Sequence, residues 1–257
     1  MQSRKNGLGV KVKITLLLAV LGSLALTACD GSDNPGATGA MAPSSTMAAS
    51  ATGPAASTSA QGASCGSGLM TVSAQANIFG AGSDFAPGPG GGGGGVVPPS
   101  LDLQEGASVV TFPTVTGKVT ARMGALAYNG ASGDGKGKTD ITSYSGISGI
   151  VDGRHGMFLV GVFLTDDPPS NVAPRRLDFT KHERFRTLAP RVGQTFFIGD
   201  GKERSFSVPK GATRLFLGFA DAFSLGEAAS QGNYQGRPGY YDNNDGHLCV
   251  AAGIEPE

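Results

Sequence analysis

Turn residues interrupt this sequence at short intervals after residue 65, and this punctuation limits what the chain can fold into. The 257 residues include 42 glycines and 15 prolines, and neither residue type is stable inside a helix. Between the turns lie apolar stretches of only a few residues, which suit strands better than helices. We therefore predict an all-β domain over residues 65–257, built as a jelly-roll-like β-sandwich.

The expected strands are short runs in which apolar residues alternate with polar ones or cluster between turns. They cover residues 71–79, 108–115, 118–128, 157–164, 195–198, 205–208, 213–220 and 248–251. Six consecutive glycines, 90–95, end the Pro- and Gly-rich segment 86–95, for which we predict a long mobile loop. The best helical candidate is the stretch 184–188, with one or two turns.

The N-terminus has the pattern of an export signal. Residues 14–28 form an apolar run of fifteen residues. The four basic residues before it are Arg4, Lys5, Lys11 and Lys13. The run is too short for a comfortable membrane span, which needs about 20 residues, but it fits the core of a signal peptide. Residues 1–28 are therefore predicted to be a signal peptide.

The end of this run, Leu26-Thr27-Ala28-Cys29, resembles the lipobox of bacterial lipoproteins, in which small residues precede an obligatory cysteine. The resemblance implies that Cys29 is lipidated and becomes the first residue of the mature protein. Two or more acyl chains would then hold the protein at a membrane of the bacterial cell envelope, since each buried CH2 contributes about 0.8 kcal/mol. The alternative is an ordinary secretory signal that is followed by a chance cysteine.

The segment 29–64 consists mostly of Ala, Ser, Thr, Gly and Pro and carries almost no charge. It has no apolar periodicity, so it cannot bury enough surface to offset the entropy cost of ordering. We predict a flexible low-complexity tether between the lipid and the folded domain. The alternative is a weakly patterned part of the domain itself.

The three cysteines are divided between these regions. With Cys29 assigned to the lipid, Cys65 and Cys249 remain, one at each end of the predicted domain. In exported proteins a remaining pair of cysteines is more often bridged than free. We therefore expect a disulfide that joins the first strand region to the last.

The charge balance and the scattered titratable residues exclude several functions. With 20 basic and 20 acidic residues the formal net charge is zero, whereas nucleic-acid binding needs a basic face. His155, His182 and His247 have no zinc-ligand spacing. We expect no nucleic-acid partner and no enzymatic activity.

The C-terminal part of the sequence gathers oxygen ligands. A predicted strand leads to Asp221, and the segment Pro238 to Val250 contains Asn243 and Asn244 beside a tight turn. Calcium prefers six to eight oxygens from carboxylates, amides and backbone carbonyls. Asp221, the two asparagines and carbonyls at 240–242 could supply several of them. The alternative is an Asn-Asp-Gly turn that holds no metal.

This region resembles the bacterial galactophilic calcium lectins and the wider set of galactose-binding-like β-sandwich modules. Their pattern L-x-L-x-x-x-D matches Leu215, Leu217 and Asp221, and their closing loop P-G-x-Y-x-N-N-x-G matches residues 238–246. The resemblance extends over residues 157–250 with interruptions. It implies a galactose-binding-like fold and a lectin-like function, calcium-dependent carbohydrate binding.

The resemblance also implies roles for individual residues. The side chains of Asp221, Asn243 and Asn244 and the backbone carbonyl of Tyr240 would bind Ca2+. The ion would bind two vicinal sugar hydroxyls, which Asp221 and Asn243 would also contact.

One departure from the family affects the function. Sixteen residues separate Asp221 from Pro238, where the lectins have very few, so the loop could be shaped differently or obstruct a sugar. Two interpretations remain. One is a lipid-anchored, calcium-dependent carbohydrate-binding protein, and the other is a structural surface lipoprotein with a purely structural calcium site or none.

Overall fold

The computed structural model describes residues 65–122, 129–135, 137–182, 184–222 and 236–256. The predicted signal peptide, the tether and Cys29 lie outside these ranges. The described part of the chain is all-β, as the sequence predicted, and its strands form several sheets. Within the same ranges, no helix has the length and hydropathy needed to cross a membrane.

Two sheets form the layers of a β-sandwich. The first has the order β1-β12-β3-β10-β8 and the second the order β2-β11-β6-β9. The first comprises β1 (Met70–Ser73), β12 (Asp245–Pro256), β3 (Ala107–Thr120), β10 (Ser205–Ser207) and β8 (Thr187–Leu188). The second comprises β2 (Ser100–Asp102), β11 (Arg214–Gly218), β6 (Val160–Leu164) and β9 (Phe196–Phe197).

A third, smaller sheet consists of β4 (Thr139–Ile141), β5 (Ile150–Asp152) and β7 (Leu177–Asp178). Two short 3-10 helices, η1 (Ile78–Gly80) and η3 (Tyr241–Asn243), connect strands. The four strands β2, β4, β5 and β7 were not predicted from the sequence. Each has only two or three residues, which is too short to show a periodic pattern.

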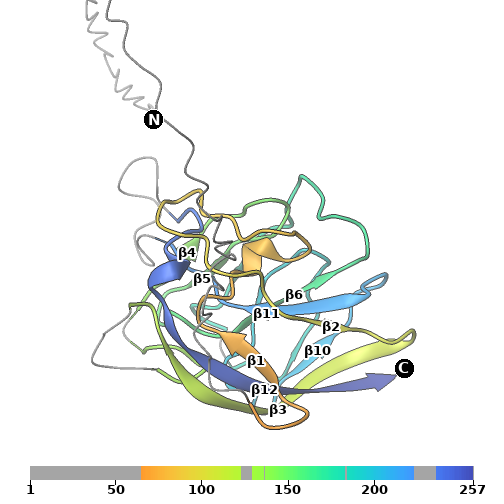
Figure 1. The fold of residues 1–257 in the computed structure, drawn as a ribbon. Coiled ribbons are helices and arrows are strands. Elements are labelled where there is room, and N and C mark those ends of the chain that lie inside the picture. Colours follow the sequence, from red (N-terminus) through yellow and green to blue (C-terminus); the bar gives the residue numbers. More distant parts are fainter. Residues whose placement is uncertain (1–64, 123–128, 136, 183, 223–235, 257) are drawn as a thin grey trace, which may run out of the picture. The chain divides into compact units, whose positions relative to one another are not determined.

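The longest strands, β3 and β12, run antiparallel along each other (Figure 1). Their register extends from Asp245 opposite Thr120 to Pro256 opposite Ala107. β3 joins the two expected strands 108–115 and 118–128 into one, although residues 123–128 lie outside the described ranges. Gly117 lies inside this strand with a φ of 107°, and a Cβ there would lie 2.4 Å from the His247 carbonyl oxygen. Glycine therefore continues the strand here where a larger residue would clash.

Phenylalanines join the two layers. Phe196 of β9 and Phe206 of β10 belong to different sheets, and their ring centroids are 4.8 Å apart. Phe196 also stacks on Phe163 of β6 at 5.2 Å. All three are completely buried, and burial of each such side chain contributes roughly 1.5–3 kcal/mol.

Two local predictions were wrong. Residues 184–188 form no helix, because Thr187 and Leu188 instead pair in parallel with Ser205 and Phe206 of β10. The expected strand 71–79 ends at Ser73. The side chain of Asn77 then accepts a hydrogen bond from the Phe79 N–H at 3.0 Å and begins the helix η1. In the first case tertiary pairing overrode local propensity, and in the second a capping side chain ended the strand.

A disulfide links Cys65 to Cys249, the pairing expected from the sequence. Their Cα atoms are 5.5 Å apart. Cys249 lies on β12 opposite Thr71 of β1, so the bond connects the start of the described domain to its last strand.

Candidate calcium site

Asp221 follows the end of β11, at one end of the second sheet. Only 2% of its surface is exposed. Its Oδ1 accepts a hydrogen bond from the Ala222 N–H at 2.7 Å, whereas its Oδ2 is buried and has no hydrogen-bond partner among the described residues. Burying a carboxylate oxygen without a partner is costly, because the protein must replace the water that it loses.

The closing loop 238–246 lies against this strand end. Ala222 and Pro238 form an isolated antiparallel bridge, and the Gly239 N–H donates to the Asp221 carbonyl at 3.1 Å. Tyr240 has a positive φ of 66°, which turns the chain into η3. The sequence-distant residues Asp221 and Asn244 are thereby brought together.

Both asparagines present unpaired oxygens in this loop. Asn244 is 1% exposed, and its Nδ2 donates to the Ala74 carbonyl at 3.1 Å. The Oδ1 atoms of Asn243 and Asn244 are buried and accept no hydrogen bond in the described part of the chain. The carbonyl of Tyr240 accepts a hydrogen bond from the Asn243 N–H at 3.4 Å, and a carbonyl oxygen has two lone pairs.

Three of these buried oxygens are unusual for a protein interior. Buried polar atoms are nearly always hydrogen-bonded, yet Asp221 Oδ2, Asn243 Oδ1 and Asn244 Oδ1 all lack a partner among the described residues. All three are oxygens, and each can only accept when Asp221 is ionised. A hard cation satisfies such a set, and a carboxylate, two amides and a backbone carbonyl match the ligand types that calcium prefers.

Electrostatics points in the same direction. The pKa of Asp221 is raised to about 7, chiefly because burial disfavours the charged carboxylate, while the polar side chain of Asn244 nearby and the hydrogen bond from the Ala222 N–H lower it. Without a cation, ionisation of this group is therefore expensive at neutral pH. A bound divalent cation would remove that cost.

Tyr241 fixes the strand end beneath the carboxylate. Its hydroxyl accepts from the Asp221 N–H at 2.9 Å and donates to the Phe219 carbonyl at 3.0 Å. The side chain is completely buried. Burial raises the pKa of the hydroxyl well above its usual value, so the hydroxyl keeps its proton. The sequence predicted no role for the Tyr241 hydroxyl. Its place inside the closing-loop motif was the available signal.

We expect Tyr241→Phe to lower the free energy of unfolding by roughly 1–3 kcal/mol, because it leaves the buried Asp221 N–H and Phe219 carbonyl without this partner. Urea unfolding of the calcium-free protein measures the change. Tyr144→Phe serves as the control, since Tyr144 is only partly buried, and it should change the free energy by less than about 0.5 kcal/mol. Equal effects of the two substitutions would contradict the bracing role of Tyr241.

The glycine-rich loop 86–95, for which we predicted a long mobile loop, packs against the closing loop and makes hydrogen bonds. Asn77 Nδ2 donates to the carbonyls of Pro87 at 2.7 Å and Gly94 at 2.9 Å. The N–H groups of Tyr240 and Tyr241 donate to the carbonyls of Gly91 and Gly93 at 3.1 and 3.0 Å.

The glycines are needed for this close approach. A Cβ on Gly93 would lie 2.6 Å from the Asp242 Cγ, and one on Gly95 would lie 2.5 Å from the Tyr241 Cβ. Both distances are too short for carbon atoms in contact. The backbone of the glycine-rich loop therefore packs closely against residues 240–242. Most of the insert between Asp221 and Pro238, residues 223–235, lies outside the described ranges.

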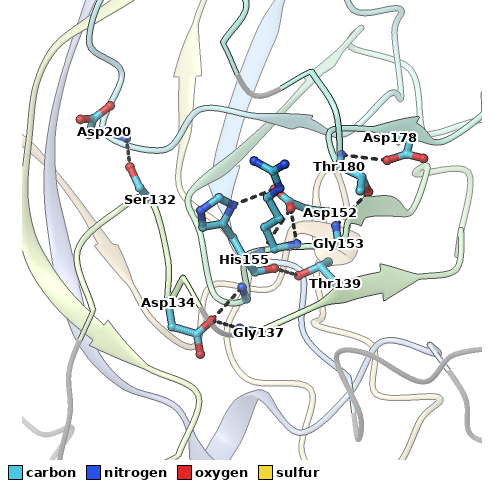
Figure 2. Close-up of polar contacts among 12 residues, drawn as sticks. Ser132, Asp134, Gly137, Thr139, Asp152, Gly153, His155, Asp178, Thr180 and Asp200 are labelled. Carbon is cyan, nitrogen blue, oxygen red and sulfur yellow. Dashed lines mark hydrogen bonds and ion pairs between the residues drawn. The ribbon is translucent and has the colours of Figure 1, made fainter.

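A second polar cluster surrounds His155 and braces turns (Figure 2). Asp152 is completely buried, and its Oδ1 accepts from the N–H groups of Arg154 and His155 at 2.8 and 3.2 Å. Its Oδ2 lies 3.2 Å from His155 Nδ1. Asp134 Oδ1 accepts from the N–H groups of Gly137 and Gly156 at 2.7 and 3.0 Å. Asp134 and Asp152 therefore stabilise turns by accepting hydrogen bonds from backbone N–H groups.

Neither a family model nor a curated protein matches this chain. The case for the site therefore depends on its geometry, and the resemblance to calcium lectins stays a prediction.

Proposed function

We propose that this protein is a lipid-anchored lipoprotein of the bacterial cell envelope whose β-sandwich binds calcium and, through it, carbohydrate. The observation that supports it is the group of buried, unpartnered oxygens Asp221 Oδ2, Asn243 Oδ1 and Asn244 Oδ1. With the Tyr240 carbonyl, they supply four of the six to eight oxygens that calcium takes. Water or sugar hydroxyls would complete the shell.

The chemistry of the ligand follows from this arrangement. A neutral sugar is heavily hydrated, and a shallow apolar site cannot replace its hydrogen bonds. Two vicinal hydroxyls can bind a calcium ion directly, while oxygens of Asp221 and Asn243 accept hydrogen bonds from them. A structural calcium ion is the second candidate function, because the same oxygens would hold an ion that only stabilises the loop.

Calcium binding is tested by thermal unfolding. At a calcium concentration one hundred times the Kd, the wild-type protein should gain about 2.7 kcal/mol, which raises the Tm by roughly 5–11 °C for a domain of this size. Asp221→Ala should abolish the gain. Asp167→Asn is the matched control, because Asp167 is exposed, and it should retain the gain. No shift of the wild type in millimolar calcium would contradict the proposal.

Carbohydrate binding is tested on the same proteins with a glycan array. Binding should require calcium and disappear in Asp221→Ala and Asn243→Ala, while Asp167→Asn binds normally. A calcium-dependent rise in Tm without any bound glycan would leave the ion structural.

Anchoring is tested by Cys29→Ser in the full chain. The variant should leave the membrane fraction or remain unprocessed, and the wild type should carry the mass of its acyl chains. Membrane fractionation that does not change, together with a wild type without acyl mass, would contradict the lipoprotein assignment.

A further inference from the structure

The third histidine, His247, lies beside the disulfide. The ligand atoms of Cys65, His247 and Cys249 all lie within 4.8 Å of one another. His247 and Cys249 are two residues apart on β12, so they point to the same side of the sheet. The intervening Leu248 is completely buried in the core. The three side chains therefore occupy the outer face, and all three residues are partly exposed.

The backbone fixes two of these ligands and leaves the third adjustable. His247 and Cys249 are held on β12 by pairing with Ser73 and Thr71 of β1 on one side and with β3 on the other. Cys65 lies just before a turn that leads into β1 and is closed by a hydrogen bond from the Leu69 N–H to the Gly66 carbonyl at 3.1 Å. Rotation of the Cys65 side chain can change its sulfur position without disturbing a strand.

We propose that Cys65, Cys249 and His247 form a zinc site when their disulfide is reduced. Two thiolates and one imidazole are ligands that Zn2+ prefers. Zinc lies about 2.3 Å from sulfur and about 2.0–2.1 Å from nitrogen, distances that three atoms within 4.8 Å of one another can reach with small side-chain movements. Water completes the tetrahedral shell.

The reaction needs a two-electron reductant, a dithiol or a phosphine; the phosphine is oxidised to its oxide with oxygen from water. A dithiol supplies two electrons and two protons, the Cys65–Cys249 S–S bond breaks, and both cysteines become thiols while the dithiol closes its own disulfide. Zn2+ then replaces the two thiol protons, which pass to the solvent, and binds the neutral imidazole of His247. Partial exposure of the three residues gives the reductant access to the disulfide.

The same two points of the chain would then be cross-linked in both redox states, by different means. In the oxidised protein a covalent bond ties the start of the domain to β12, and in the reduced protein a zinc ion would tie the same two points. This proposal does not depend on calcium or carbohydrate binding, since the residues of the two sites are different.

The full chain tests the proposal, with a water-soluble phosphine as the reductant and Zn2+ as the probe in competition with a chromophoric chelator. The reduced protein should bind one zinc ion that the oxidised protein does not bind. Co2+ in place of zinc should give a thiolate-to-cobalt charge-transfer band. His247→Ala should weaken zinc binding about tenfold or more, and the exposed His182→Ala should not.

Two controls separate this site from other thiols. The double variant Cys65→Ser/Cys249→Ser keeps Cys29 and should bind no zinc under either condition. The reduced protein should still unfold cooperatively, so that binding is measured on the folded domain. Equal zinc binding by the reduced wild type and the double variant, or by wild type and His247→Ala, would overturn the proposal.

Discussion

The calcium-free protein should lose stability as the pH rises from about 4 to 7, because of Asp221. Its pKa is about 7 in the folded protein and near 3.9 in the unfolded chain. Between these values the folded state holds a proton that the unfolded state has released. The free energy of unfolding therefore falls with rising pH, by about 4 kcal/mol once both pKa values are passed.

Asp221→Asn isolates this contribution. In the presence of a calcium chelator, the variant should be more stable than the wild type at pH 8, by up to about 4 kcal/mol, and of similar stability at pH 4. Urea unfolding at both pH values measures the difference, and Asp167→Asn should follow the wild type. A constant difference between the variant and the wild type at the two pH values would contradict a raised pKa for Asp221.

Reduction of the Cys65–Cys249 disulfide should lower the free energy of unfolding by about 5 kcal/mol in the absence of zinc. The two cysteines are 184 residues apart, and the chain-entropy model predicts a large gain in unfolded-state entropy when so long a loop opens. Urea unfolding with and without a phosphine reductant measures the loss.

The double variant Cys65→Ser/Cys249→Ser provides the comparison. It should match the reduced wild type and should not respond to the reductant. A loss of less than about 1 kcal/mol on reduction would mean that the unfolded chain already keeps its two ends together.

Local pattern was sufficient for the fold class and for part of the candidate site. Alternating apolar residues between glycine and proline turns predict strands, because successive side chains of a strand point to opposite faces of the sheet. The asparagines 243 and 244 are adjacent in the chain and close to Tyr240, so a motif within one loop can identify them. With Cys29 assigned to the predicted lipid anchor, cysteine counting predicted the pair Cys65–Cys249 that the disulfide joins.

Local pattern was insufficient wherever a partner lies far away in the chain. Residues 184–188 read as a helical turn, but Leu188 pairs with Phe206, and nothing near residue 188 encodes that neighbour. The expected break between 108–115 and 118–128 disappeared because β12 pairs with β3 from Ala107 to Thr120, with two register shifts on the way.

The candidate site likewise depends on both the local sequence and long-range packing. The sequence determined which oxygen-bearing residues are present and that three of them share one loop. Only the tertiary structure decided that Asp221 is buried against Asn244, that the Tyr241 hydroxyl joins the Asp221 N–H to the Phe219 carbonyl, and that the glycine-rich loop packs closely beside them. Burial and the raised pKa of Asp221 arise from segments near residues 77, 91, 221 and 241 packing together, and long-range packing of this kind leaves no periodic signal in any one segment.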